Sequence, residues 1–215
     1  MRTAARALSV LVLAVLIGGC AQVEGSGNVV SESRDVSGIT ALEFGEDGDL
    51  LVEQTGTESL TITADDNLLP YLKSEVRGGR LIIGNRDGIN LRPSTTIVVK
   101  LTVRNLNAIS LSGDGTIDAR GINSDQLRIS VSGDGRIEAA GKAETQEIKV
   151  SGDGSYTAEQ LTSKVARVQI SGDGKAVLAV TEKLDARISG DGSVEYTGNP
   201  AVTQNISGDG SVRKR

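Results

Sequence analysis

The 215-residue sequence contains no histidine and no tryptophan, and it has one cysteine, one phenylalanine and three tyrosines. Without histidine it can form neither a Ser-His-Asp triad nor a Cys-His pair, and no zinc site that contains histidine. The single cysteine, Cys20, excludes an intramolecular disulfide, so the fold depends on its core for stability. That core must be built from Val, Ile, Leu and Ala. We therefore expect no catalytic residue and no cofactor.

Basic residues are also in the minority. Lys and Arg number 23 against 28 Asp and Glu, which gives a formal net charge of −5. Removal of residues 1–19, argued next, also removes Arg2 and Arg6 and leaves 21 basic against 28 acidic residues. Such a surface lacks the basic footprint and the stacking aromatics that nucleic-acid binding needs. The composition therefore argues against a nucleic-acid partner.

The first twenty residues have the pattern of an export signal. Arg2 and Arg6 form a positive region, residues 7–17 are an apolar run too short to span a bilayer, and two glycines precede Cys20. The ending "LIGGC" resembles a bacterial lipoprotein signal. The resemblance implies a signal peptide at residues 1–19 and lipidation of Cys20 by a diacylglyceryl group and an amide-linked acyl chain such as palmitate, which give stable anchoring. The alternative is an ordinary secretory signal with an incidental cysteine.

The residues after the cysteine bear on the location of the protein. Ala21 is not the aspartate that retains many lipoproteins at the inner membrane, so the resemblance favours export to the cell envelope and anchoring in the outer membrane of a Gram-negative bacterium. Residues 20–33 are predicted to be the lipid anchor and tether, with "VEGSGN" at 23–28 as a short Gly/Ser linker. The membrane is then a partner reached through Cys20.

A tetrapeptide repeat is the strongest signal in the chain. Ser-Gly-Asp-Gly occurs six times at intervals of 18 to 20 residues, beginning at Ser112, Ser132, Ser151, Ser171, Ser189 and Ser207. An aliphatic residue precedes each serine, and apolar residues alternate on both sides of most copies. Short alternating runs bounded by glycine indicate β-strands, and a unit of this length must stack on its neighbours to bury an apolar face. The sequence predicts an all-β fold, a parallel β-helix or β-solenoid with 18–20 residues per turn over residues 109–215.

Other periodic architectures fit less well. Leucine-rich repeats need a denser leucine pattern, propeller blades need about 40 residues each, and a calcium-binding β-roll uses nonapeptides with two Gly-rich turns per coil. An antiparallel sandwich of hairpins stays open as an alternative, because Asp-Gly between apolar alternations is also a strong hairpin signal. The constant period favours stacking.

The motif itself is predicted to be the corner of each turn. Glycine permits a sharp bend, and Ser and Asp can hydrogen-bond the backbone of a tight turn. A second hypothesis is a cation ladder, because stacked turns bring the motif carboxylates together at ~4.8 Å, where like charges repel unless salt or calcium relieves them. Its members are Asp114, Asp134, Asp153, Asp173, Asp191 and Asp209.

The region 34–108 is less regular. "ALEFGEDGDLLVEQ" at 41–54 contains a degenerate motif, and residues 59–65, 80–84 and 95–103 have the texture of strands. Residues 66–76, "DNLLPYLKSEV", are the one predicted helix, ended by Gly78-Gly79. We interpret this region either as the first solenoid turns with longer connections or as a β-rich cap, because open solenoid ends need covering.

Over nearly the whole mature chain the sequence resembles the auto-transporter adhesin head domain family, also called the GIN-type domain. The resemblance rests on "GSGNVVSESRDVSGITALEF", "DGDLLVEQ", "LTITADDNLLPYL" and the serial "SGDG" units in combination. It implies a right-handed β-helix at the bacterial cell envelope, with no catalytic residues to carry over. A lipid anchor at Cys20 would replace the translocator of a true auto-transporter.

The leading hypothesis is a non-catalytic, adhesin-like binding module for a protein or glycan surface, because solenoids present long repeated faces. The positions after each motif would form a mixed polar stripe, made of Thr116, Arg136, Ser155, Lys175, Ser193 and Ser211. The alternatives are a carbohydrate-active enzyme, suggested by fold analogy alone, and a purely structural envelope protein. The basic end of the chain, residues 213–215, is predicted to protect an exposed sheet edge. The sequence leaves the oligomeric state open.

Overall fold

The computed structural model describes residues 21–215, so the predicted signal peptide and Cys20 lie outside the described residues. The described chain is all-β, with one short 3₁₀ turn, η1, at Leu69–Tyr71. No helix within it is long and apolar enough to cross a membrane. The strands are β1 (Ala21–Glu24), β2 (Val29–Arg34), β3 (Ala41–Phe44), β4 (Asp49–Gln54), β5 (Ser59–Asp65), β6 (Leu72–Arg77), β7 (Arg80–Asn85), β8 (Ile89–Arg92), β9 (Val98–Val103), β10 (Ala108–Ser112), β11 (Thr116–Ser132), β12 (Arg136–Ser151), β13 (Ser155–Ser171), β14 (Lys175–Ser189), β15 (Ser193–Thr197), β16 (Ala201–Ser207) and β17 (Ser211–Lys214).

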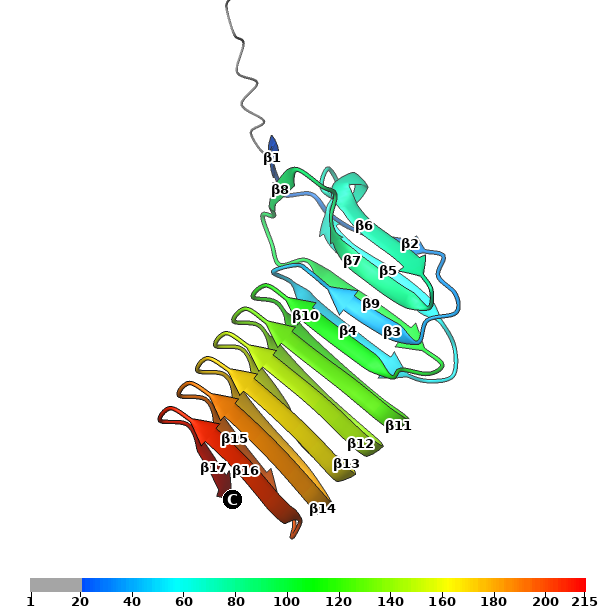
Figure 1. The fold of residues 1–215 in the computed structure, drawn as a ribbon. Helices are drawn as coiled ribbons and strands as arrows, with labels where there is room; N and C mark the ends of the chain where they lie inside the picture. The colour runs from blue at the N-terminus through cyan, green and yellow to red at the C-terminus, as the bar shows by residue number, and fades with distance from the viewer. Residues whose placement is uncertain (1–20) are drawn as a thin grey trace, which may run out of the picture.

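The predicted solenoid is confirmed. From β10 onward, each turn pairs in parallel with the next, and the turns stack as a row of parallel rungs (Figure 1). The six motif serines pair with one another in unbroken register from Ser112 to Ser207. Parallel pairing at every step excludes the hairpin alternative for this part of the chain. β1 and the C-terminus lie at opposite ends of the stack (Figure 1).

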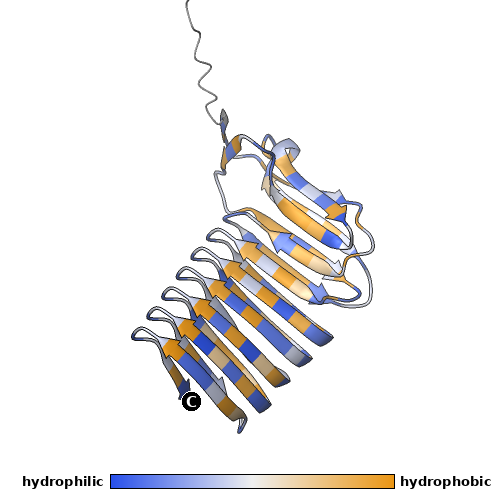
Figure 2. Ribbon diagram, in the orientation of Figure 1, coloured by the Kyte–Doolittle hydropathy of each residue, from blue (hydrophilic) through white to orange (hydrophobic). Residues whose placement is uncertain are grey.

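The core is a set of aliphatic columns inside the stack. Alternate residues point inward along each strand, which Figure 2 shows as bands of apolar and polar colour across the rungs. One column runs through consecutive turns and is buried from its first to its fifth member: Ile109, Ile129, Ile148, Val168 and Ala186. Its sixth position is Gln204, in the last turn, where the interior opens to solvent. The polar residue therefore stands where the solenoid ends.

One buried polar cluster interrupts the apolar core. Tyr156 is the largest fully buried side chain, and its hydroxyl donates a hydrogen bond of 2.7 Å to Gln146 Oε1. The Gln146 amide in turn donates to Ser163 Oγ at 2.9 Å. Burial raises the pKa of Tyr156, so its hydroxyl stays a proton donor. The cluster links three polar side chains within the core so that each has a partner.

The two glycine positions of the motif require glycine for different physical reasons. The first glycine of each copy has a positive φ, between 101° and 117°, which side-chain-bearing residues rarely adopt. The second glycine has no room for a side chain, because a Cβ on Gly154 would lie 2.5 Å from Val131 Cγ1 and 2.8 Å from the Gly135 carbonyl oxygen of the preceding turn. The motif is a tight corner packed against the corner before it, as predicted.

The first turns follow a different order in space from their order in sequence. β3 lies between β7 and β10, and β4 lies between β9 and β11, all in parallel. The degenerate motif at 45–48 therefore forms a corner in the same row, and Asp114 N donates to Asp47 Oδ1 at 3.3 Å. In this region solenoid turns are present, and further strands cover their end.

Antiparallel strands cover the N-terminal end. β5 pairs with β9 and β2 pairs with β5 on one side, while β6 pairs with β7 on the other. Arg34 connects the two sides, because its guanidinium donates to the carbonyl oxygens of Leu72 at 2.7 Å and Leu69 at 2.8 Å. These antiparallel strands thus end the parallel stacking and cover the N-terminal end of the solenoid.

The predicted helix at 66–76 is wrong. Only η1 is helical there, and residues 72–77 form strand β6, which pairs with β7. Gly78 and Gly79, with φ of 57° and 81°, make the two-residue turn of a hairpin rather than the end of a helix. Pairing with β7 outweighs the local helical pattern.

The segment 23–28, predicted to be a short Gly/Ser linker, is fastened to the domain. Ser26 Oγ donates to Asp66 Oδ1 at 2.6 Å, Gly27 N donates to Asp65 Oδ1 at 2.7 Å, and Ser26 N donates to Asn67 Oδ1 at 2.9 Å. Just before and after this segment, β1 pairs with β8 and β2 pairs with β5. We call the contact of residues 65–67 with residues 24–28 the N-terminal clasp. The interpretation of 20–33 as a tether is corrected for the described residues, because their polar groups are held by hydrogen bonds.

Candidate binding groove beside the motif corners

After each motif corner the chain runs along one side of the solenoid, which we call the post-motif face. It consists of β4, the first parts of β11 to β14, β15 and β17. The predicted polar stripe lies on this face in strict register, because each member pairs with its counterpart in the next turn. It begins at Thr116 and Arg136 and ends at Ser211. Side chains that follow the same corner are thus placed one above another.

A second column lies two residues further along each strand. It runs through Asp118, Glu138, Thr157, Val177, Glu195 and Arg213. The sequence interpretation did not single out this column, although the same period-two spacing that gave the stripe also predicts it. Together the two columns give the face charged side chains of both signs.

Two shallow hollows adjoin on this face. The first, of about 380 Å³, has Asp118, Arg120 and Gln160 in its lining. The second, of about 290 Å³, has Arg136, Lys175 and Arg215 in its lining. Both hollows are also lined by Glu138, Thr157 and Glu159. We call the two together the post-motif groove; it crosses several turns of the stack.

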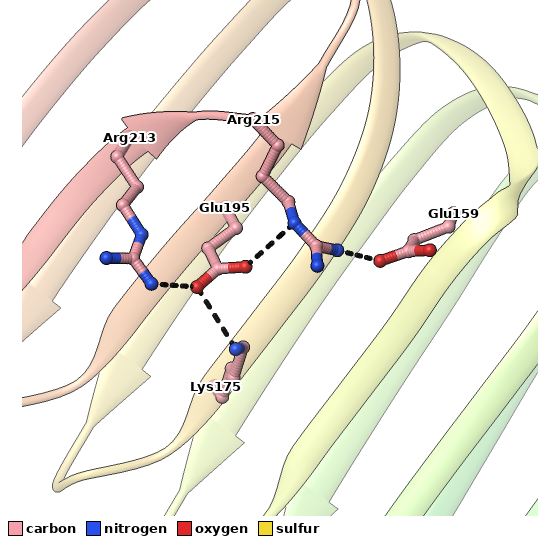
Figure 3. Close-up of polar contacts among 5 residues, drawn as sticks. All are labelled: Glu159, Lys175, Glu195, Arg213 and Arg215. Carbon is pink, nitrogen blue, oxygen red and sulfur yellow. Dashed lines mark hydrogen bonds and ion pairs between the residues drawn. The ribbon is translucent and has the colours of Figure 1, made fainter.

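An ion-pair cluster stands at the C-terminal end of this groove (Figure 3). The side chain of Glu195 is only 4% exposed, and it receives Lys175 Nζ at 3.1 Å, Arg215 Nε at 3.2 Å and the guanidinium of Arg213. Arg215 also contacts Glu159 on the groove wall. The hydrogen bond from Arg213, and then that from Lys175, holds the pKa of Glu195 below its usual range. Two of the three basic residues predicted to protect the sheet edge therefore bind a buried carboxylate.

The motif aspartates form a row along one edge, as the register requires. Their side chains are exposed, and Asp209 N donates to Asp191 Oδ1 at 3.3 Å, like the contact of Asp114 with Asp47. Within residues 21–215, no three Asp, Glu or Cys side chains gather closely enough to hold a metal ion. The hydrogen bonds agree with a corner-forming role, and the cation ladder at Asp114, Asp134, Asp153, Asp173, Asp191 and Asp209 stays a prediction.

The chemistry available in the groove is that of polar recognition. Several carboxylates are neutralised by a neighbouring cation, such as Asp118 by Arg120 at 2.7 Å and Glu159 by Arg215. Side chains of both signs line a shallow surface, and the lining includes no aromatic residue. Such a surface suits contact with a partner of mixed charge.

Solved structures with the same architecture include proteins of Bacteroides and Parabacteroides species. A protein of Bacteroides fragilis described as a "putative adhesin" has a TM-score of 0.72 at 21% identity, over 90% of this chain and 100% of that one. A "putative lipid binding protein" from Parabacteroides distasonis has a TM-score of 0.64 at 22% identity, over 90% and 99% of the two chains. A "putative adhesin" from Parabacteroides merdae has a TM-score of 0.63 at 21% identity, over 91% and 99%. At these identities the likeness shows the shared fold.

The sequence itself identifies the family. No curated protein matches the chain. Residues 38–200 match the family described as "Putative auto-transporter adhesin, head GIN domain", which includes five of the six motif corners and the post-motif groove from Asp118 to Lys175. The chain, a β-solenoid built on Ser-Gly-Asp-Gly corners, belongs to this adhesin head GIN domain family.

Proposed function

We propose that the protein is a non-catalytic, adhesin-like binding module, anchored by lipid at Cys20 to the outer membrane of a Gram-negative bacterium. Its ligand site is the post-motif groove, and its partner is a protein surface of mixed charge. The observation that carries the proposal is the groove itself, which crosses several turns on a regular face and whose lining contains charges of both signs. Membership of an adhesin-described family supports the same conclusion.

The choice of a protein over a glycan rests on the lining. Sugar rings are commonly bound on aromatic side chains, and the groove lining has none. The lining combines the cations Arg120, Arg136 and Lys175 with the carboxylates Asp118, Glu138 and Glu159, which favours electrostatic complementarity with a partner that carries charges of both signs. Glycoside hydrolysis needs two carboxyl groups that act together, whereas Asp118 and Glu159 in this groove are each paired with a cation. We therefore propose binding rather than hydrolysis.

The anchor is proposed from the sequence of the signal, and the fold supports its geometry. Ala21 already begins strand β1, so no residue lies between Cys20, the proposed lipid-bearing residue, and the first strand. β1 and the C-terminus lie at opposite ends of the stack (Figure 1). An anchored protein would therefore present the length of the post-motif face away from the lipid.

The anchor is tested by metabolic labelling of the full chain with an alkyne analogue of palmitate. Label on the wild-type protein in the outer-membrane fraction, and its absence from Cys20→Ser, supports the proposal. A labelled Cys20→Ser variant, or an unlabelled wild-type protein released in soluble form, contradicts it.

The groove is tested by binding of the purified protein to immobilised matrix proteins and to a panel of glycans. We expect saturable binding to protein that weakens as salt is raised, and a loss of about tenfold or more in Arg136→Glu. Arg167→Glu, an exposed charge reversal on another face, is the matched control and should bind like the wild type. Equal losses in both variants, or binding to glycans alone, would contradict this assignment.

A further inference from the structure

Two buried oxygen atoms in the described part of the chain lack any hydrogen-bond partner. They are Glu46 Oε1 and Asn85 Oδ1. Buried polar atoms are nearly always paired in folded proteins, so an unpaired acceptor needs a physical explanation. Here both atoms are acceptors, and one belongs to a carboxylate.

These two residues are neighbours across the first turns of the solenoid. Phe44 pairs with Ile83, and Gly45 N donates to the Ile83 carbonyl oxygen at 2.9 Å, so the chain that follows each strand continues side by side. A Cβ built on Gly84 would lie 3.7 Å from Glu46 Oε1, which places the carboxylate against the segment that contains Asn85. The Glu46 carboxylate thus lies beside the segment that also carries the second unpaired acceptor, Asn85 Oδ1.

Glu46 holds an unusual position in the row of corners. In the regular motif this position is a glycine with positive φ, for example Gly113, whereas no residue other than glycine has a positive φ in the described chain. The corner at 45–48 therefore has a different backbone, and Glu46 is only 6% exposed. Burial, with a contribution from nearby Asp47, raises the pKa of Glu46 to about 7, opposed by hydrogen bonding from the Asn85 main chain. A charged Glu46 at this site lacks a positive partner.

We propose that Glu46 and Asn85, together with Asp47, bind a hard divalent cation of the calcium type. Carboxylate and amide oxygens are the ligands that such ions prefer, and water or main-chain carbonyls complete their coordination. Asp47 adds a second carboxylate, of which Oδ1 makes only a long contact of 3.3 Å with Asp114 N. The site differs from the exposed aspartate ladder because a buried carboxylate with one unpaired oxygen, Glu46 Oε1, defines it. The bound ion would join the turn between β3 and β4 to the end of β7, at the place where the regular glycine corner is missing.

Calcium titration of the purified protein, read by thermal unfolding and by calorimetry, tests this site. We expect one equivalent of bound calcium and a saturable rise in Tm of about 3–8 °C at 10 to 100 times Kd, above an equal-ionic-strength control. Glu46→Gln should abolish both signals and remain folded, because its amide can donate to Asn85 Oδ1. Asp134→Asn, which removes an exposed carboxylate from a regular corner, is the matched control and should keep both.

Three outcomes overturn the proposal. If Asp134→Asn loses the response and Glu46→Gln keeps it, calcium binds the ladder instead. If calcium has no effect but acid stabilises the wild type and not Glu46→Gln, a proton joins the two acceptors. If neither calcium nor acid distinguishes Glu46→Gln from the wild type, the Asn85 amide turns its nitrogen to Glu46 and no ion is needed.

Discussion

The two halves of the molecule build the same kind of turn by different means. From β10 onward each turn is closed by a glycine corner, and the next turn stacks on it in sequence order. In the N-terminal half the corners contain side chains such as Glu46 and Asn85, the turns stack out of sequence order, and antiparallel strands and the N-terminal clasp hold them together. A repeated sequence motif is enough to specify the turns of one half, whereas the turns of the other half need polar contacts between residues far apart in the sequence.

This difference follows from what a glycine corner allows. Without Cβ atoms, successive corners approach closely enough for direct backbone hydrogen bonds, such as Gly154 N to the Gly133 carbonyl oxygen at 2.9 Å. A corner with a side chain at either glycine position cannot be repeated in so close a stack, so its neighbours must be specified individually. The regular half should therefore respond to added volume at its corners, and the irregular half to the loss of polar contacts.

The largest effect is expected for Gly154→Ala in the regular half. The new methyl group would lie 2.5 Å from Val131 Cγ1 and 2.8 Å from the Gly135 carbonyl oxygen, so the backbone of two turns must move. We expect a loss of about 2–3 kcal/mol and a fall in Tm of roughly 4–12 °C, measured by thermal unfolding.

Gly56→Ala is the control for this prediction. Gly56 lies between β4 and β5 with a φ of 89°, and a Cβ there meets no atom within 4 Å. Its cost should be roughly 1 kcal/mol, from the backbone conformation alone. Equal effects of the two substitutions would mean that the close approach of successive corners does not limit the regular stack.

A smaller and more local effect is expected for Asp65→Asn in the N-terminal half. Asp65 is fully buried and accepts hydrogen bonds from Gly27 N and from the hydroxyl and main-chain N–H of Ser94. The Ser94 hydroxyl contributes most to a lowered pKa of Asp65. An asparagine presents an N–H group to one of these donors, so the N-terminal clasp should open.

Hydrogen exchange read by mass spectrometry measures this opening. We expect exchange of residues 25–28 to accelerate by about tenfold or more, while β11 to β14 keep their protection. Asp134→Asn, the same substitution at an exposed regular corner, should change hydrogen exchange in neither region. Faster exchange in β11 to β14 after Asp65→Asn would show that the two halves unfold as one unit and would remove the distinction between them.

The regular half could be predicted from sequence because its rule is local. Each Ser-Gly-Asp-Gly copy marks a corner, and the alternation on both sides gives the inward and outward faces, so the core columns and the polar stripe follow directly. The degenerate motif at 45–48 was recognised in the same way. Its stacking between β7 and β10 was not, because alternation does not say which strands pair.

Other errors have the same origin. Residues 66–76 were predicted to be a helix ended by Gly78-Gly79, but these two glycines form a hairpin that pairs residues 72–77 with β7. The segment at 23–28 has a linker composition, and only its hydrogen bonds with residues 65–67 reveal that it is fixed. Glu195 is on an outward position by alternation, and it is covered by Lys175 of the preceding turn and by Arg213 and Arg215 of the following turn.

The smallest effect is expected at Glu195, at the C-terminal end of the regular stack. Its partners Lys175, Arg213 and Arg215 have side chains that are about half exposed or more, so solvent screens the pairs. Because the pKa of Glu195 is lowered in the folded protein, its contribution is present above the unfolded value of about 4.3 and is lost as pH falls through the folded pKa. Glu195→Gln should therefore lower Tm slightly at pH 7, and the difference from the wild type should vanish in acid.

Thermal unfolding of both proteins between pH 7 and pH 2.5 measures this difference directly. Glu147→Gln is the control, because Glu147 forms a single exposed pair of 3.6 Å with Arg128 on another face, and it should match the wild type at every pH. If the Glu195→Gln difference persists at the acidic end, the side chain acts through packing and not through charge. The last turn would then resemble the turns before it, and the end of the solenoid would need no ionic closure. If the difference vanishes, specific polar contacts stabilise the C-terminal end of the solenoid, as they do its N-terminal end. Only the turns between the two ends would then depend on glycine corners alone.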